Sequence, residues 1–179
     1  TRSLVSPDTE DWPQIQVTFT TMENADTKKK QHTEVFDALM VCNGHYSRPR
    51  FPNTPGLEHF QGTVLHSIEY DTPEVYHNQR VLCVGGRASG SDIAREIGQD
   101  ETTTVFLSDS GFHAQKPITC NNNITWVPST TAVLQDGRVA FDKEIVEPQH
   151  FDTIIFCSGY DYNFSFINQD SNLELEFSQ

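Results

Sequence analysis

The residues whose types and spacing best fit a chemical role form a glycine-rich turn at residues 85–90, with the sequence Gly-Gly-Arg-Ala-Ser-Gly. An apolar run precedes it, which is typical of a buried strand, and a short helix is predicted for residues 91–97. In the GxGxxG pattern the first glycine makes the tight turn, the second lets the backbone approach a pyrophosphate, and the third allows close helix packing. These positions are Gly85, Arg87 and Gly90. The turn predicts a phosphate cradle, and a strand-to-helix turn without a ligand is the alternative.

Arg87 stands where the pattern has its second glycine. Its side chain would either crowd the phosphate or swing outward and donate charged hydrogen bonds to it. Gly86, immediately before it, gives the loop additional freedom. The sequence leaves both interpretations of Arg87 open.

A second candidate, Asp109, follows the strand predicted for residues 104–107. The residue that reads the ribose in dinucleotide-binding units lies roughly 20 positions beyond the glycine-rich turn. Ser108 and Asp109 stand in this region. The Asp109 carboxylate would accept a hydrogen bond from a ribose 2′-hydroxyl and repel a 2′-phosphate, which favours NAD(H) over NADP(H). A solvated aspartate in a turn is the alternative.

Other catalytic templates fit poorly. Ser89 is not in a nucleophile elbow, because its flanking positions are Arg87 and Ser91, and no Walker A lysine follows the turn. The seven histidines lack metal-ligand spacing, so we expect no metal site. The four cysteines form no CxxC pair and are interpreted as free thiols, three of them in strands. No catalytic residue is identified.

Composition limits the partners of the chain. A formal net charge of −13 and an isoelectric point near 4.7 argue against a general affinity for nucleic acid or anionic membranes. No apolar run approaches the roughly 18 residues of a membrane-spanning helix, and no secretory pattern opens the chain. We therefore expect a cytoplasmic protein, or one on the cytosolic face of a membrane if a further C-terminal part anchors it.

The N-terminal third predicts strands and a linker. Residues 15–20 alternate between apolar and polar types, as in a half-buried strand, and a second strand is predicted for residues 33–36. The polar stretch 24–32 is interpreted as their connecting loop. The apolar run 37–44 is interpreted as a buried strand that ends in a sharp turn. Three prolines between residues 49 and 55 indicate an extended interdomain linker.

The remainder predicts an α/β fold. The order strand, helix, strand around the glycine-rich turn requires a parallel sheet. Asp136-Gly137 predicts a tight hairpin within residues 133–141. Residues 152–159 predict another buried strand, whose Asp, Cys and Gly repeat the spacing found in residues 37–44. Any buried strand that ends in a turn could look like this, so the repeat alone leaves its meaning open.

A longer motif resembles a known family. Residues 60–70 match the FxGxxxHxxxY fingerprint of the flavin-containing monooxygenases, with Phe60, Gly62, His66 and Tyr70 in place. With tyrosine at the last position, the motif resembles that of the family branch that oxidises heteroatoms. The Baeyer-Villiger branch usually has tryptophan at this position.

Three further segments resemble the same family in the same order. They are residues 43–46 with the prolines that follow, residues 89–94, and residues 156–160. With the fingerprint, these motifs cover about residues 33–162. In this family, segments like residues 37–44 and 152–159, which each run from an aspartate to a glycine, link an FAD domain and an NADPH domain.

The resemblance implies an enzyme that uses NAD(P)H, FAD and O2 to oxygenate the nitrogen or sulfur of a small lipophilic amine or sulfide. It also implies roles for individual residues. Those placed at the cofactors are Asn43, Gly44, Gly85, Gly86, Arg87, Ser89, Gly90, Ser108, Asp109, Ser158 and Gly159. His66 and Tyr70, with Phe60 and Gly62, are expected to support the domain junction, and for His66 a structural role is preferred over a chemical one.

The chain also departs from the family. The FAD-binding GxGxxG of the family is not among these residues, so this stretch alone is not expected to bind FAD stably. Asp109 stands where members that use NADPH usually carry arginine. These departures leave open a non-catalytic nucleotide-binding or interaction module derived from the family. A related pyridine nucleotide–FAD reductase is a third reading, although it should show a CxxC pair.

The expected fold is a three-layer, Rossmann-like nucleotide-binding domain flanked by β-meander pieces of an FAD-binding domain. Its expected divisions run in chain order: residues 1–52 in the FAD-binding domain, 53–79 as interdomain linker, 80–159 as the NAD(P)H-binding domain, and 160–179 as the return toward the FAD domain.

Overall fold

The computed structural model describes residues 14–23, 28–120 and 123–165. Two compact units emerge: residues 1–44 with 164–179, and residues 45–163. No helix among the described residues is long and apolar enough to cross a membrane.

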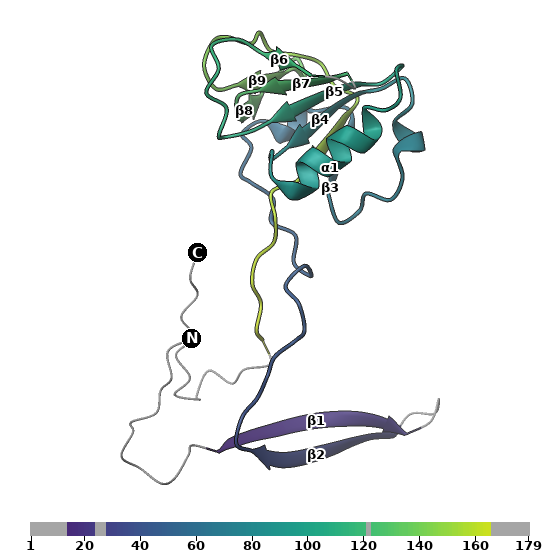
Figure 1. Ribbon diagram of the computed structural model, residues 1–179, viewed down its shortest axis with the longest axis vertical. Helices are drawn as coiled ribbons and strands as arrows, with labels where there is room; N and C mark the ends of the chain where they lie inside the picture. Colours follow the sequence, from purple (N-terminus) through teal and green to yellow (C-terminus); the bar gives the residue numbers. More distant parts are fainter. Residues whose placement is uncertain (1–13, 24–27, 121–122, 166–179) are drawn as a thin grey trace. The chain divides into compact units, whose positions relative to one another are not determined.

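The second unit is built on a six-stranded sheet with the order β3-β10-β4-β5-β7-β6 (Figure 1). All neighbouring strands run parallel except β6, which is antiparallel to β7. The strands are β3 (Thr63–His66), β4 (Arg80–Val84), β5 (Thr104–Ser108), β6 (Ile118–Thr119), β7 (Ile124–Val127) and β10 (Thr153–Phe156).

Each face of this sheet carries its own hydrophobic core. On one face the helix α1 (Ala88–Ile97) packs against residues that include Cys83, Val105 and Ile155. On the other, the hairpin of β8 (Thr130–Val133) and β9 (Val139–Phe141) packs against a second cluster that includes Leu82, Ile154 and Phe156. Adjacent residues of a strand point to opposite faces, so the apolar runs of β4 and β10 supply both cores. The expected three-layer α/β architecture is confirmed.

Helix α1 begins three residues earlier than predicted, so the last residues of the glycine-rich stretch form its first turn. Ile93, Ala94 and Ile97 are buried on one face, as the helical spacing predicts. Gly98 ends the helix as predicted, in a right-handed conformation, and its N–H donates to the carbonyl of Ala94 at 2.9 Å.

The predicted hairpin is also confirmed. β8 and β9 pair antiparallel, and Gly137 adopts a φ of 83° in the turn between them. That left-handed conformation is the one for which Asp-Gly turns are favoured.

Two short 3-10 helices complete this unit: η1 (Leu57–His59) and η2 (Pro73–Tyr76). Between them β3 pairs with β10. Residues 53–79, expected as an interdomain linker, therefore contribute a strand to the sheet and belong to the same compact unit as residues 80–159. The sequence of residues 60–70 did not indicate this strand, because β3 pairs with β10, which lies about 90 residues later in the chain.

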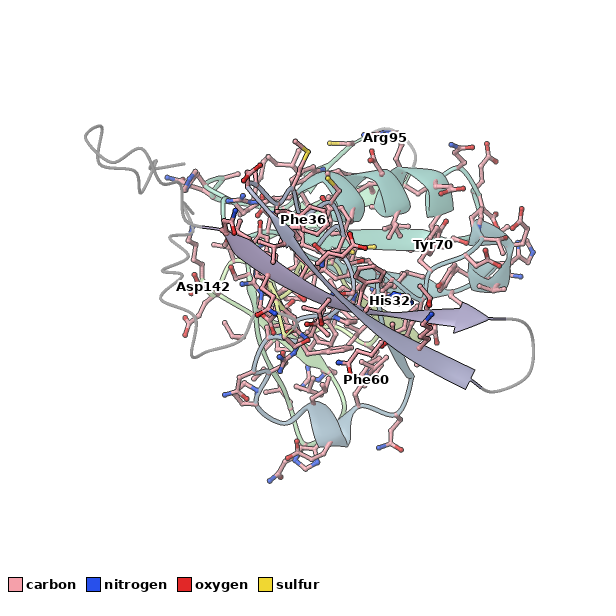
Figure 2. The ribbon with its side chains drawn as sticks, turned by 90° about the horizontal axis from the view of Figure 1, so that it is seen from below. His32, Phe36, Phe60, Tyr70, Arg95 and Asp142 are labelled. Atoms are coloured by element: carbon pink, nitrogen blue, oxygen red, sulfur yellow. The ribbon has the colours of Figure 1, made fainter. Side chains whose placement is uncertain are left out.

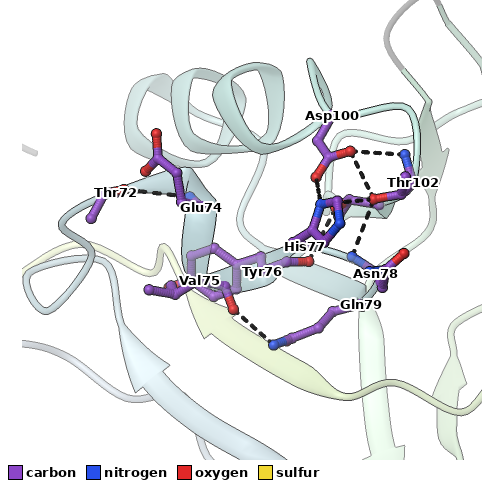
Figure 3. A network of polar contacts seen from close by, with 10 residues as sticks. Thr72, Glu74, Val75, Tyr76, His77, Asn78, Gln79, Asp100 and Thr102 are labelled. Atoms are coloured by element: carbon purple, nitrogen blue, oxygen red, sulfur yellow. Dashed lines mark hydrogen bonds and ion pairs between the residues drawn. The ribbon is translucent and has the colours of Figure 1, made fainter.

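A polar network closes the amino end of the sheet, beyond η2 (Figure 3). Nδ1 of His77 lies 2.6 Å from Oδ2 of Asp100. The other carboxylate oxygen, Oδ1, accepts from the backbone N–H of Thr102 at 2.9 Å and from its hydroxyl at 2.7 Å. These bonds tie the loop after α1 to the segment before β4.

The first unit contains a hairpin of β1 (Ile15–Glu23) and β2 (Lys28–Phe36), paired antiparallel with Phe19 opposite His32. Both strands were predicted, but β2 begins five residues earlier than expected. Residues 28–32 are therefore strand and not loop, while residues 24–27 lie outside the described residues. Residues 28–32 are polar, so they lack the alternation of apolar and polar residues that predicts a strand. Their pairing with β1 is what shows that they are a strand.

The strand predicted for residues 37–44 is wrong. This segment has no strand hydrogen bonding, and Met40 is 86% exposed. A strand requires a hydrogen-bonded neighbour, and none of the described strands pairs with this run.

The cysteine prediction holds in part. All four cysteines are free, but only Cys83 lies within a strand. Cys157 follows β10 directly and is buried, whereas Cys42 and Cys120 are exposed outside the strands.

Candidate functional site

The candidate site lies at the carboxyl edge of the parallel sheet. Strands β3, β10, β4 and β5 end side by side, with Phe156 paired to His66 and to Val84, and Val84 paired to Ser108. The segments after these strands therefore meet at one edge, where open α/β sheets bind their ligands. They carry most of the residues that the sequence predicted.

Close backbone approach explains two glycines of the turn. Gly85 has a φ of 113°, and a Cβ at this position would lie 2.5 Å from the carbonyl oxygen of Cys157. A Cβ on Gly90 would overlap the carbonyl oxygen of Gly85. The turn thus packs against both α1 and the segment after β10, and no larger residue fits at either position.

The first turn of α1 favours an anion. It contains no acidic residue, and its N-cap, Arg87, provides no capping side chain, so the free N–H groups and the positive end of the helix dipole are not compensated. Ser91 Oγ donates to the carbonyl of Gly86 at 2.8 Å and fixes the turn.

Two side chains at this turn point to solvent. Ser89 and Arg87 are exposed, and within the described part of the chain the Arg87 guanidinium makes no hydrogen bond or ion pair. Of the two sequence interpretations, this favours an Arg87 side chain that swings outward. It leaves the guanidinium free for a phosphate.

Asp109 lies directly beside the glycine-rich turn. A Cβ added to Gly86 would be 2.7 Å from Cβ of Asp109. The carboxylate is half-buried, and its Oδ1 accepts from the N–H of Gly111 at 3.2 Å. The structure therefore brings the predicted ribose reader and the predicted phosphate cradle together.

Ser108 differs from its prediction. Its side chain is buried, its hydroxyl donates to the carbonyl of Pro128 at 2.9 Å, and the same oxygen accepts from the N–H of Thr130 at 2.8 Å and from its hydroxyl at 3.0 Å. The hydroxyl has no capacity left for a cofactor. It links β5 to the start of β8.

His66 is fully buried at the end of β3. Its Nδ1 lies 3.2 Å from the backbone nitrogen of Ile68, and its Nε2 lies 3.0 Å from the carbonyl oxygen of Gly159. A backbone N–H can only donate, so Nδ1 accepts and Nε2 carries the proton. Both nitrogens are thus occupied within the fold, as expected for a structural histidine.

Ser158 and Gly159 hold a second segment, residues 48–50. The Arg50 guanidinium donates to the Ser158 carbonyl from Nε at 3.2 Å and from Nη2 at 3.0 Å, and the Ser158 hydroxyl donates to the Arg50 carbonyl. The Arg50 N–H donates to the Gly159 carbonyl at 3.0 Å. Sequence reasoning missed Arg50, because nothing near it in the chain indicates a partner 108 residues away.

The fingerprint residues brace both faces of the sheet. Phe60 packs into the core on the β8–β9 face and Tyr70 into the core beside α1, so the two are well separated in Figure 2. A Cβ on Gly62 would overlap the carbonyl oxygen of Asp152. Tyr70 stacks on Tyr76 with ring centroids 5.9 Å apart, and burial, assisted by the nearby Glu96, raises the pKa of Tyr70 well above its usual range. The motif is therefore structural in this unit.

Asn43 and Gly44 belong to the first unit and are exposed. Gly44 adopts a φ of 68° at the end of the apolar run.

Comparison with known proteins shows which family the chain belongs to. The model of the family described as flavin-binding monooxygenase-like matches residues 7–115. The flavin-containing monooxygenase FMO GS-OX5 of Arabidopsis thaliana is 32% identical over 175 residues, which cover 97% of this chain and 36% of the relative. FMO GS-OX-like 1 of the same plant is 34% identical over 143 residues, covering 80% of this chain and 30% of the relative.

Solved structures agree. The S-allyl-L-cysteine S-oxygenase from Allium sativum superposes with a TM-score of 0.75 at 30% identity, covering 91% of this chain and 36% of that one. Tmm from Pelagibacter sp. shares the fold, with a TM-score of 0.67 at 21% identity. The chain spans about a third of the length of these relatives. The family match, the relatives and the shared fold agree, and the chain belongs to the flavin-binding monooxygenase-like family.

Proposed function

We propose that the chain is the nucleotide-binding part of a flavin-dependent monooxygenase. In this proposal the enzyme uses NAD(P)H, FAD and O2 to oxygenate the nitrogen or sulfur of a small lipophilic substrate. One arrangement carries it: at the carboxyl edge of a parallel sheet, a member of this family combines an uncompensated helix N-terminus with a close-packed glycine turn and an arginine that has no ion pair among the described residues.

The residues at this edge fit a nicotinamide dinucleotide. The first-turn N–H groups of α1, together with Arg87 and Ser89, would hold the pyrophosphate. The lack of side chains at Gly85 and Gly86 lets the turn pack against Cys157 and Asp109. Asp109 would accept hydrogen bonds from the adenosine ribose. His66, Ser158 and Gly159 would keep the neighbouring strand ends in place.

The flavin supplies the redox and oxygen chemistry when bound. We assign the β1–β2 hairpin to the FAD-binding domain of the whole protein, together with Asn43 and Gly44. The described residues at the sheet edge would bind the nicotinamide nucleotide and hold the glycine-rich turn in place around it.

Sulfur is the first substrate atom to test. One solved relative is named as an S-oxygenase of S-allyl-L-cysteine. A small thioether of this kind, and a tertiary amine of similar size, cover the two substrate classes of the proposal.

The experiment is steady-state turnover of the purified full-length protein, loaded with FAD, under isotopically labelled O2. We expect oxidation of the nicotinamide nucleotide to yield a sulfoxide or N-oxide that carries one labelled oxygen, measured by mass spectrometry. Nucleotide binding without labelled product from either substrate would contradict the monooxygenase and support a non-catalytic binding module. Flavin reduction that passes electrons to a disulfide, without labelled product, would instead indicate a reductase.

A further inference from the structure

We infer that the dinucleotide site selects NAD(H) over NADP(H), because Gly86 and Gly111 together fix the Asp109 carboxylate at the position of the adenosine ribose. The inference rests on the proposed function only in requiring a dinucleotide at this edge of the sheet. It concerns how the 2′ position of that dinucleotide is read.

The carboxylate of Asp109 is seated between two glycines. A Cβ on Gly86 would lie 2.7 Å from Cγ and 2.8 Å from Oδ2 of Asp109, and a Cβ on Gly111 would lie 3.3 Å from Oδ2. Neither glycine has a positive φ. Their small size, and not an unusual backbone conformation, is what the site requires, because a side chain at Gly86 would displace the carboxylate.

One oxygen of the carboxylate is anchored and the other is available. Oδ1 accepts the hydrogen bond from the N–H of Gly111 at 3.2 Å, while Oδ2 lies against Gly86 and has no hydrogen-bond donor among the described residues. This leaves an acceptor for a ribose hydroxyl beside the glycine-rich turn. A ribose 2′,3′-diol satisfies it, whereas a 2′-phosphate offers a second anion.

No cation within the described residues neutralises Asp109. Lys143 already has a fixed partner, because its Nζ donates to the carbonyl of Phe112 at 2.9 Å. Arg87, at the N-cap of α1, is the remaining cation of the turn, and its position assigns it to the pyrophosphate, which NAD(H) and NADP(H) share. The half-buried negative charge therefore disfavours a 2′-phosphate.

Isothermal titration of the full-length protein with NADH and with NADPH tests the inference directly, without requiring oxygenation. We expect NADH to bind at least about ten-fold more tightly than NADPH. Preferential binding of NADPH overturns the inference and leaves the proposed function standing. Binding of neither nucleotide overturns both.

Variants test the roles of the Asp109 charge and of Gly86 separately. Asp109→Asn keeps the shape and removes the charge, so NADPH affinity should rise and the preference should fall at least about five-fold. Gly86→Ala should lower NADH affinity by displacing the carboxylate. Glu101→Gln, an equal change of charge on an exposed residue of the loop after α1, should leave the preference unchanged.

Arg87→Ala distinguishes the two phosphate groups. If Arg87 contacts the pyrophosphate, the variant weakens NADH and NADPH by similar factors. A selective loss of NADPH affinity would show that Arg87 reads the 2′-phosphate and would contradict the inference, as would an unchanged preference in Asp109→Asn.

Discussion

Nε2 of His66 donates a hydrogen bond to the carbonyl oxygen of Gly159, 3.0 Å away and 93 residues later in the chain. The bond joins the end of β3 to the turn after β10, and the Arg50 N–H reaches the same carbonyl at 3.0 Å. One backbone oxygen thus joins three segments at the carboxyl edge of the sheet. Its histidine donor is the central residue of the family fingerprint.

Replacing His66 by alanine should destabilise the second unit. The change empties a fully buried position and leaves the Gly159 carbonyl and the Ile68 N–H with one partner fewer, which costs about 2–4 kcal/mol. Chemical denaturation followed by tryptophan fluorescence measures the loss. His113→Ala, at an exposed loop position, is the matched control, and equal stability of the two variants would contradict a structural role for His66.

Replacing Gly90 by alanine should disrupt the glycine-rich turn. The new methyl group would overlap the Gly85 carbonyl, so the helix must move away from β4, at a cost of about 1–3 kcal/mol. Thermal unfolding and dinucleotide titration should both report the change. Ser89→Ala, at the exposed neighbouring position, should stay within about 0.5 kcal/mol of the parent in stability. A Gly90→Ala protein of parental stability and affinity would refute the close packing.

Arg50→Met should loosen the pairing of residues 48–50 with residues 158–161. The side chain loses both guanidinium bonds to the Ser158 carbonyl but keeps its approximate length. Hydrogen exchange should accelerate in these two segments and stay unchanged in β5. Arg50→Lys should recover little of the protection, since one ammonium cannot reproduce the two bonds. Unchanged exchange in Arg50→Met would count against this clamp.

The Asp100 network predicts an acid-sensitive contribution to stability. Hydrogen bonds from the Thr102 N–H and hydroxyl, and then from His77, lower the pKa of Asp100 to about 2. Because the folded pKa of about 2 lies below the unfolded value of roughly 3.9, the contribution is complete above about pH 5 and is lost as pH falls toward about 2.

The corresponding test compares unfolding curves of the parent and Asp100→Asn between about pH 2 and pH 5. The parent should lose stability more steeply than the variant as pH falls through this window. Parallel curves would show that Asp100 is not perturbed in the folded protein. Asp152→Asn, on the opposite side of β4 from the network, supplies a second carboxylate for comparison.

Local signals predicted much of the fold. The apolar runs of β4 and β10, the helical spacing of Ile93 and Ile97, and the Asp136-Gly137 turn each specify their element from neighbouring residues alone. The spacing of dinucleotide-binding turns singled out Gly85, Gly90 and Asp109. That Asp109 lies beside Gly86 is seen only in the structure.

Features that depend on distant partners were not predictable in this way. The pairing of β3 with β10 and the bond from Arg50 to Ser158 form only when remote segments meet. Ser108 was misread for the same reason, because its hydrogen-bond partners lie 20 and 22 residues further on. Residues 37–44 show the converse case: an apolar run without a described neighbour forms no strand.

The position of β10 in the sheet affects when the second unit can form during synthesis. β10 lies between β3 and β4, although it follows them by 69 or more residues. At a translation rate of about 5–20 residues per second, several seconds separate the emergence of β4 from that of β10. Throughout that interval β3 lacks the one strand that it pairs with among the described residues, and one edge of β4 is unpaired. A nascent chain therefore exposes strand edges that are prone to aggregation until β10 emerges.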